Sequence, residues 1–385
     1  MKVEHNIARL KQLIEMYKLS IPQFLELISE GLKTPITEED VFSSKIKLSH
    51  LKRIDKLFEK GLHYYLNPKA PVNAKERSIF FRKQNFATDD LNIGATKVVN
   101  KFEELKLSLS GIAKLSNTKT KRKLEKYSVK DDPQNVAVAV REKLYPPFTS
   151  KRRDFLKALI SKFAEQHILV FEFIETWNKK NKANIDGFFL KPNMIVLKRH
   201  QAFRREIFTL AHELGHYLLD EEEIERLDYH SIGEKSTSKI ERWCNDFAFY
   251  FLCGEYSKNL KSLETASSQN DYHHETIKFI SEHTHLSQMA LFTRLLFDKK
   301  ISQANYNRVK SEFDEDIRKK QEEKKLENQL LKEQGKKQRG AVAKPISSPL
   351  FVSTIQNAFY EGVLNEYEVC KKLNIKPDKF ESYIQ

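Results

Sequence analysis

The sequence predicts an α+β fold that is mostly helical, with a small antiparallel or mixed sheet packed against a helix that carries His212 and His216. Three observations lead to this prediction. Apolar residues recur at helical spacing along most of the 385 residues. Short β-prone runs gather in the middle of the chain, at 168–173, 185–190 and 194–198. Helical regions flank this central part on both sides, as in folds that segregate a small sheet among helices.

The central elements follow one another closely along the chain. The runs at 185–190 and 194–198 flank Lys191-Pro192-Asn193, a turn signal that predicts a hairpin. The helix with the two histidines comes directly after this hairpin, and its apolar stripe predicts a buried face. Gly215 costs this helix about 1 kcal/mol relative to Ala. We therefore expect a neighbouring strand to approach the helix closely at this glycine.

We expect five regions along the chain. They are a small helical region at 1–65 that resembles a degenerate helix-turn-helix domain, a helical and basic connector at 66–131, a metal-binding domain at 132–302, a charged linker at 303–345 and a small helical region at 346–385.

Two charged stretches define the predicted connector and linker. Residues 114–130 contain seven Lys or Arg and one acidic residue, Glu125, which is typical of a mobile basic connector. Residues 309–339 are dense in Lys, Glu and Gln, with too few regularly spaced apolar residues for a coiled coil. This second stretch is predicted to be a solvated helix or a disordered linker.

Composition and charge exclude several classes of protein. The three cysteines form no Cys-x-x-Cys pair, so neither a disulfide framework nor a thiolate zinc site is indicated, and a reducing, cytoplasmic setting is expected. No apolar run approaches the length needed to cross a membrane, and the charged N-terminus does not resemble a signal peptide. The formal net charge of +14 favours an acidic partner such as nucleic acid, although a merely basic, soluble surface explains it equally well.

The motif that carries chemistry is His-Glu-x-x-His, formed by His212, Glu213 and His216. On a helix, the two histidines project from the same face one turn apart, so both imidazoles can bind one zinc ion. Glu213 lies beside them, where its carboxylate can take a proton from the attacking water. The same pattern also occurs by chance in unrelated proteins. Its position after a predicted strand, on an apolar helix, favours a metal site here.

A catalytic zinc site needs a third protein ligand. The place six residues after His216, where some zinc enzymes carry a histidine, is occupied by Glu222. Glu241 begins an apolar helical run 25 residues after His216, and it is the third ligand that we predict. Asn245 follows one turn later, placed to hydrogen-bond a ligand histidine. Two alternatives stay open: Glu241 as a carboxylate that stabilises a helix start, and His230 as the third ligand.

Other polar residues near the motif receive weaker predictions. Tyr217, Tyr229 and His230 are alternatives for stabilising the oxyanion, and the sequence does not choose among them. Two further pairs of histidines have a spacing that does not suit a site with Glu241, and we interpret them as surface polar residues: His273 with His274, and His283 with His285.

Three separated motifs, in this order, resemble the ImmA/IrrE family of metallopeptidases over about residues 132–300. The first two are Ile185-Asp186-Gly187-Phe188 and the stretch from Phe208 to His216. The third carries Glu241, Cys244, Asn245, Phe247, Ala248, Phe251 and Leu252. The chain departs from the usual family pattern at Cys244, where Ala is usual, and at Cys253-Gly254, where a pair such as Met-Pro is usual.

The resemblance implies a gluzincin-like zinc site with His212, His216 and Glu241 as ligands and Glu213 as the base. It also implies a protein substrate, typically a transcriptional repressor encoded nearby, whose cleavage releases stress or defence genes. Family members often carry an N-terminal helix-turn-helix domain of the phage-repressor type. We therefore expect a cytoplasmic zinc endopeptidase that does not act at a membrane. The alternative is a DNA-binding regulator, binding through its N-terminal region, whose peptidase-like domain is inactive or structural.

Overall fold

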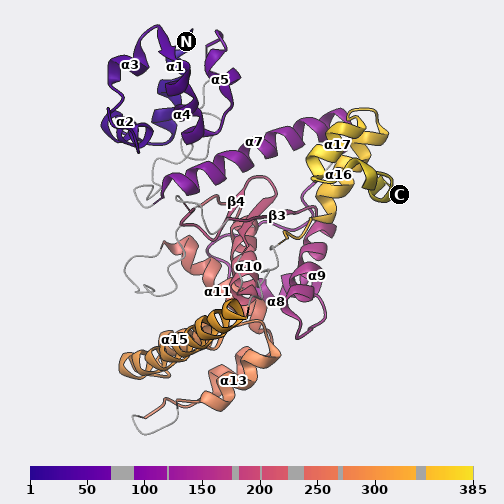
Figure 1. Ribbon diagram of the computed structural model, residues 1–385. Coiled ribbons are helices and arrows are strands. Elements are labelled where there is room, and N and C mark those ends of the chain that lie inside the picture. Colours follow the sequence, from indigo (N-terminus) through magenta and orange to yellow (C-terminus); the bar gives the residue numbers. More distant parts are fainter. Residues whose placement is uncertain are drawn as a thin grey trace. The chain divides into compact units, whose positions relative to one another are not determined.

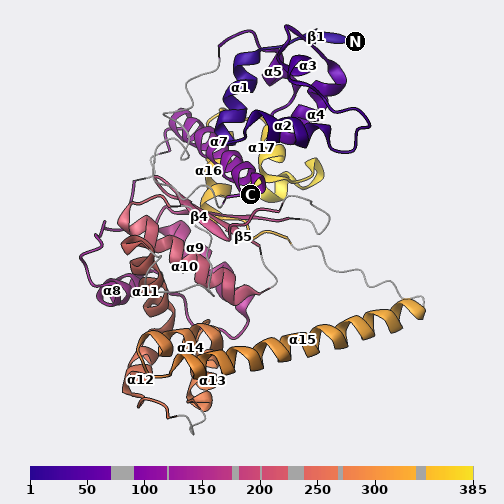
Figure 2. The same ribbon diagram turned by 90° about the vertical axis from the view of Figure 1, so that its left-hand side faces the viewer.

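The computed structural model describes residues 1–70, 91–118, 121–175, 182–199, 202–223, 238–267, 272–334 and 344–384 (Figures 1 and 2). The chain divides into two compact units. The first unit contains residues 1–105 and 179–185, and the second contains residues 106–178 and 186–385. No helix in the described part of the chain is long and apolar enough to cross a membrane.

The first unit is a bundle of short helices with a small sheet (Figure 1). Its strands β1 (Lys2–Glu4) and β2 (Lys45–Lys47) pair in antiparallel register. Its short helices are α1 (Ile7–Met16), α2 (Ile21–Ser29), α3 (Glu38–Phe42), α4 (Leu48–Phe58) and α5 (Leu62–Leu66), followed by the longer α7 (Ile93–Leu115), which continues into the second unit. Apolar residues spaced by three and four on α1 and α4, such as Leu10 and Leu51, form its core.

A mixed three-stranded sheet lies at the centre of the second unit. Its strands are β3 (Leu169–Phe173), β4 (Gly187–Leu190) and β5 (Met194–Lys198), in the order β3-β5-β4. β4 and β5 form the predicted hairpin, while β3 and β5 run parallel. All four residues of β4 are buried, because the sheet packs against α10 (Phe203–Leu219), the helix with the two histidines. The predicted fold class is therefore confirmed.

Helix α10 packs most extensively against α11 (Lys239–Cys253). At Gly215 the backbone of α11 comes so close that a Cβ atom on the glycine would lie 3.1 Å from Cα of Cys244 and 3.0 Å from its Sγ. The expectation that a strand approaches this glycine is therefore wrong, since the close neighbour is a helix. The absence of a side chain lets α10 bring its histidines next to the residues of α11.

The remaining helices complete the second unit around this pair. They are α8 (Pro133–Leu144), α9 (Arg152–Glu165), α12 (Tyr256–Ser262), α13 (His274–His283), α14 (Gln288–Phe297), α15 (Gln303–Glu333), α16 (Pro349–Tyr360), α17 (Glu366–Leu373), the 3-10 turn η3 (Pro377–Lys379) and α18 (Glu381–Ile384). α15 begins on the core with Tyr306 and Val309, but beyond Glu315 its described side chains are largely exposed. Of the two alternatives for the charged stretch, the structure shows the solvated helix for residues up to 333.

Within the second unit, the C-terminal region packs on the other elements through α16. α16 contacts α9, and the rings of Phe351 and Phe171 lie 5.1 Å apart between centroids. The backbone N–H of Ile346 donates a hydrogen bond to the carboxylate of Glu172 in β3. Glu172 is buried near Arg199, which pairs with Glu206 of α10. This network of buried charges joins the sheet, helix α10 and the start of the C-terminal region.

The basic stretch predicted to be a mobile connector contacts the C-terminal end of α10. Arg122 donates to the backbone oxygens of Tyr217 and Leu218, at 2.7 and 3.2 Å. The Tyr127 N–H also donates to the oxygen of Leu218, and Lys126 pairs with Asp220 at 2.6 Å. These cations and donors satisfy the last carbonyls of the helix and complement its dipole. Residues 121–127 are therefore part of the fold, and the prediction of mobility is wrong for them.

Candidate metal centre

Three of the predicted site residues come together between α10 and α11. His212 and His216 lie one turn apart on α10, and Glu241 lies in the first turn of α11. Ser238 caps α11 by accepting a hydrogen bond from the Glu241 N–H at 3.1 Å, which fixes where the helix begins. The site residues are almost fully buried. Within the described part of the chain, these three side chains are the group that can hold a metal ion.

The distances between the three side chains suit a single tetrahedral ion. Nε2 of His212 lies 3.1 Å from Nε2 of His216. The carboxylate oxygens of Glu241 lie 3.2 Å from His212 Nε2 and 3.0 Å from His216 Nε2. Two ligands that are each about 2.0–2.1 Å from a tetrahedral zinc ion are separated by roughly 3.3 Å. Two nitrogens and one oxygen at this spacing form a donor set that fits zinc.

The protonation of Glu241 also suits a metal ligand. Burial alone would favour its neutral form, but the adjacent His212 and His216 hold the pKa of this carboxyl well below its usual range. The thiol of Cys244 lies next to His216, and burial raises its pKa to about 11. Glu241 is therefore an anion at neutral pH, as a carboxylate ligand must be.

Asn245 lies where the sequence placed it, one turn after Glu241 and beside a histidine. Its Oδ1 is 3.0 Å from Nδ1 of His212. Since the amide oxygen is an acceptor, His212 carries its proton on Nδ1 and leaves the lone pair of Nε2 for a metal ion. The same hydrogen bond fixes the orientation of the ring.

Replacing Asn245 by Ala should weaken zinc binding by roughly 10–100-fold, because the His212 ring loses the acceptor that orients it. Competition with a chelator of known affinity measures this change. Asn245→Asp keeps an acceptor oxygen at the same place and should retain most of the affinity. An unchanged affinity in Asn245→Ala would mean that the ring is oriented by its packing alone.

Glu213 is buried beside the two histidines. Burial raises its pKa to about 7, although the neighbouring histidines oppose this shift. Its Oε2 has no hydrogen-bond partner among the described residues. A buried carboxylate oxygen without a partner is costly in a purely structural role. This cost favours a role in which the oxygen binds a ligand or accepts a proton.

Strand β4 begins with Gly187, next to α10, and the space there admits no side chain. A Cβ atom there would lie 2.6 Å from Cγ2 of Thr209 and 3.4 Å from Cγ of Glu213. Any side chain would therefore push β4 away from α10 and disturb the position of Glu213. The sequence pattern around this glycine is thus explained by close packing of the sheet on the metal helix.

The other predicted residues near the motif have neighbours of their own or lie outside the described part of the chain. Tyr217 is buried against Phe189, with Arg122 stacked on its ring, whereas Tyr229 and His230 lie outside the described residues. Glu222 accepts a hydrogen bond from the Lys191 N–H at 2.7 Å.

His285 is not the surface residue that the sequence suggested. It is buried, with its ring 3.9 Å from that of Phe155, and burial lowers its pKa to about 4. His283 is exposed, while His273 and His274 are half-buried. The prediction of surface residues is therefore wrong for His285, which belongs to the core.

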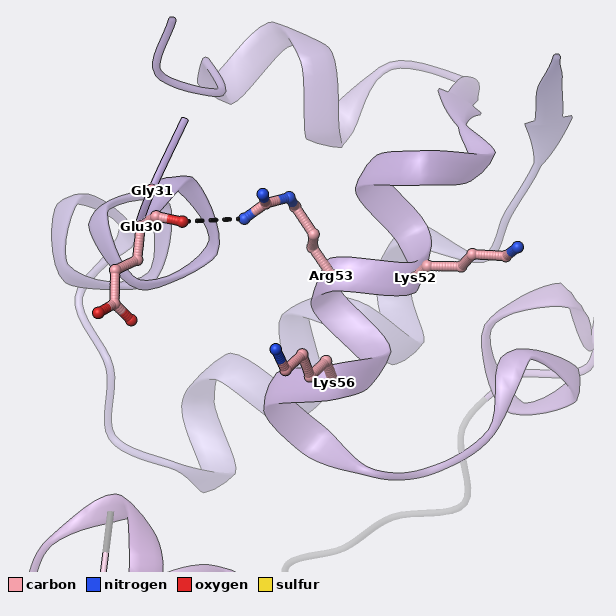
Figure 3. A pocket seen from close by; sticks show the side chains of 5 residues that line it. All are labelled: Glu30, Gly31, Lys52, Arg53 and Lys56. Carbon is pink, nitrogen blue, oxygen red and sulfur yellow. Dashed lines mark hydrogen bonds between the residues drawn. The ribbon is translucent and has the colours of Figure 1, made fainter. Parts of the chain in front are cut away.

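The described residues also form two hollows that the sequence did not predict, among others. One is a cavity of about 420 Å³ in the second unit, between α10, α11 and α14, with Asn245 in its wall. The other lies in the first unit and is lined by Glu30, Gly31, Lys52, Arg53 and Lys56; Figure 3 shows the side chain of Arg53 reaching toward Glu30. Arg53 donates hydrogen bonds to the backbone oxygens of Ile28 and Glu30, and so caps the C-terminal end of α2.

Comparison with known proteins agrees with this geometry. Residues 165–291 match the model of the peptidase M78 family, described as an IrrE N-terminal-like domain. This match confirms the resemblance to the ImmA/IrrE family, and the segment is a metallopeptidase-like domain that contains His212, His216 and Glu241. Neither the curated proteins nor the solved structures gave a match to the chain.

Proposed function

We propose that this protein is a zinc-dependent endopeptidase that cleaves a partner protein. The observation that carries the proposal is the buried set of His212, His216 and Glu241, with the carboxylate of Glu213 beside it on the same helix. The match to a peptidase family supports a protein substrate.

The chain's own residues divide the work of peptide hydrolysis. His212, His216 and Glu241 would hold the ion, and Asn245 orients His212 through the hydrogen bond to Nδ1. When bound, zinc would lower the pKa of water and polarise the peptide carbonyl. Glu213 would take the proton of the attacking water and pass it to the leaving amide nitrogen. Burial raises the pKa of Glu213 and makes it a stronger base than an exposed carboxylate.

The proposed substrate is a helix-turn-helix transcriptional repressor encoded near this protein, and its cleavage would derepress stress or defence genes. This part of the proposal is supported by the resemblance to the ImmA/IrrE family. The test is to incubate the zinc-loaded chain with the repressor encoded beside it and to measure intact masses. We expect two fragments that together account for the repressor. An intact repressor in the presence of a fully zinc-loaded chain would contradict this choice of substrate.

A second candidate function is DNA binding by the N-terminal unit. The formal net charge of +14 and the exposed Lys52 and Lys56 on α4 favour contact with phosphates. Other features oppose sequence-specific recognition. Helix α2, which follows α1 after a short turn, contains no Lys or Arg, and the first turn of α3 holds only acidic side chains.

The full chain should therefore bind duplex DNA weakly and without sequence preference. We expect affinity to fall by roughly 10–100-fold between about 50 and 200 mM salt, because a few phosphate contacts dominate. A gel-shift titration of two unrelated duplexes at both salt concentrations measures this. Tight binding to one operator sequence that resists salt would instead support a transcriptional regulator as the main function.

A further inference from the structure

The cavity of about 420 Å³ in the second unit is separate from the metal centre. Asn245 lines it and contacts Nδ1 of His212, whereas a metal ion would bind at Nε2, on the other side of that ring. The residues that line the cavity do not include the metal ligands or the proposed base, which are His212, His216, Glu241 and Glu213. The proposed peptidase chemistry therefore does not account for this cavity.

The wall of the cavity is mostly apolar. Its large side chains come from three helices, with Phe203 and Phe208 from α10, Phe249 from α11, and Met289 and Phe297 from α14. Its volume falls within the range of pockets that bind small organic molecules. A hydrocarbon chain or ring gains free energy in such a cavity because it leaves water.

Two of the arginines that line the cavity are neutralised by acidic neighbours. Arg205 forms an ion pair with Asp186. Arg294 forms ion pairs with Asp246 at 2.6 Å and with Asp298 at 3.1 Å. Because these guanidinium groups are already paired, they contribute little attraction for a further anion.

Arg152 and Arg204 also line the cavity, and no ion pair within the described part of the chain engages either of them. Arg204 donates a hydrogen bond to the backbone oxygen of Ser281, but its Nε is buried and has no partner among the described residues. Burial and repulsion by Arg152 lower the pKa of Arg204, against the weaker attraction of Glu282. Two guanidinium groups in this state favour a ligand that carries a carboxylate.

The N-terminal end of α10 lies at the same part of the cavity, since Ala202, Phe203 and Arg204 line it. Ala202 at the N-cap has no side chain that can accept a hydrogen bond from the first N–H groups of the helix. Glu206, the acidic residue of the first turn, is engaged by Arg199. A carboxylate beside this end of the helix would be stabilised by the helix dipole.

We propose that this cavity binds a small amphipathic carboxylate, such as a medium-chain fatty acid. Its apolar body would fill the space between α10, α11 and α14, and its carboxylate would lie by Arg152, Arg204 and the first turn of α10. The inference does not rest on the proposed peptidase activity. It assigns a second ligand site to the domain, and the metal ion is not part of that site.

Calorimetry with the full chain and four probes tests the site, using hexanoate, octanoate, 1-octanol and octylammonium. Octanoate should bind at a single site and about 15-fold more tightly than hexanoate, because two more methylene groups are buried. 1-Octanol has the same chain without the charge and should bind at least about tenfold more weakly than octanoate. Octylammonium should not bind detectably, since Arg152 and Arg204 repel it.

The zinc-loaded and zinc-free forms of the chain distinguish the cavity from the metal centre. Octanoate should bind both forms with the same affinity, because none of the metal ligands lines the cavity. Binding that requires zinc would mean that the carboxylate binds the metal ion, and it would overturn the proposal. This comparison is informative whether or not the chain cleaves a protein.

Two neighbouring arginines offer a matched pair of variants. Arg152→Gln should weaken octanoate binding by about tenfold and leave 1-octanol binding unchanged, because only the charged contact is lost. Arg153→Gln removes the same charge from the next residue, which is exposed and does not line the cavity, and should bind octanoate as the wild type does. Equal affinities in the two variants would show that octanoate responds only to the net charge of the chain, and the proposed site would then be wrong.

Ala290 gives a second pair that tests the apolar part of the site. Ala290→Phe places a ring in the cavity and should weaken the binding of octanoate by at least about tenfold, whereas Ala290→Ser keeps the volume and should retain it. Unchanged binding in folded Ala290→Phe would place the hydrocarbon chain elsewhere and overturn the proposal. If Ala290→Phe does not fold, the arginine pair decides.

Discussion

Glu213→Gln should lower the rate of substrate cleavage by about 10²–10⁴-fold and leave the zinc content unchanged. The amide has nearly the shape of the carboxylate, so packing against Gly187 is kept. It cannot accept the proton of the attacking water. Elemental analysis of zinc and the rate of appearance of a cleavage product measure the two effects. Undiminished cleavage by this variant would contradict the role of Glu213 as the base.

The pH dependence of the wild-type rate gives an independent check on Glu213. A base works only when it is deprotonated, so the rate should rise with pH through the pKa of Glu213. Burial raises that pKa to about 7 against the opposing effect of the two histidines, and a cation bound nearby would favour the carboxylate and lower it. The zinc-loaded enzyme should therefore lose activity on the acid side, below pH 7. In Glu213→Gln the residual rate should no longer show this step.

Glu241→Ala should weaken zinc binding by more than about 100-fold, since even residues that only orient a ligand are worth 10–100-fold. The variant removes the carboxylate that lies 3.0–3.2 Å from both histidine nitrogens and leaves two protein ligands. Chelator competition measures the affinity, and cleavage should fall with it. Glu221→Ala removes a nearby acidic residue and should bind zinc as the wild type does.

The rival ligand His230 provides the decisive comparison for Glu241. His230→Ala should leave zinc binding unchanged if Glu241 is the third ligand. The reverse pattern, with zinc lost in His230→Ala and retained in Glu241→Ala, would transfer the ligand role to His230. His212→Ala should abolish binding in either case.

Much of the candidate site could be predicted because it depends on local rules. The spacing of His212 and His216 places both rings on one helix face, and this rule needs no knowledge of the rest of the fold. Glu241 and Asn245 could be found because the second helix shows its own apolar stripe, which must face the first. The cavity could not be predicted in the same way. It depends on how α14 packs against α10 and α11, and the spacing of apolar residues along the sequence does not predict that packing.

The errors in the predicted fold have a common cause. The glycine at 215 was expected to meet a strand, and residues 121–127 were expected to be mobile. The sequence correctly indicated a close approach at Gly215 and a basic segment at 121–127. The partner was a distant part of the chain. Arg122 lies 95 residues from Tyr217, and local pattern gives no information about such pairs. The prediction of an antiparallel or mixed sheet left open which strands pair in parallel, for the same reason, and the structure pairs β3 with β5.

The contacts of Arg122, Lys126 and Tyr127 with the end of α10 bear on how the molecule can be divided. A fragment that begins at residue 132, where composition alone suggests that the domain begins, would leave the last carbonyls of the metal helix without these donors. It would also bare the ring of Tyr217, on which Arg122 stacks. We therefore expect a fragment of the metallopeptidase-like domain to be stable only when it begins upstream of Arg122, about forty residues before the segment that matches the family.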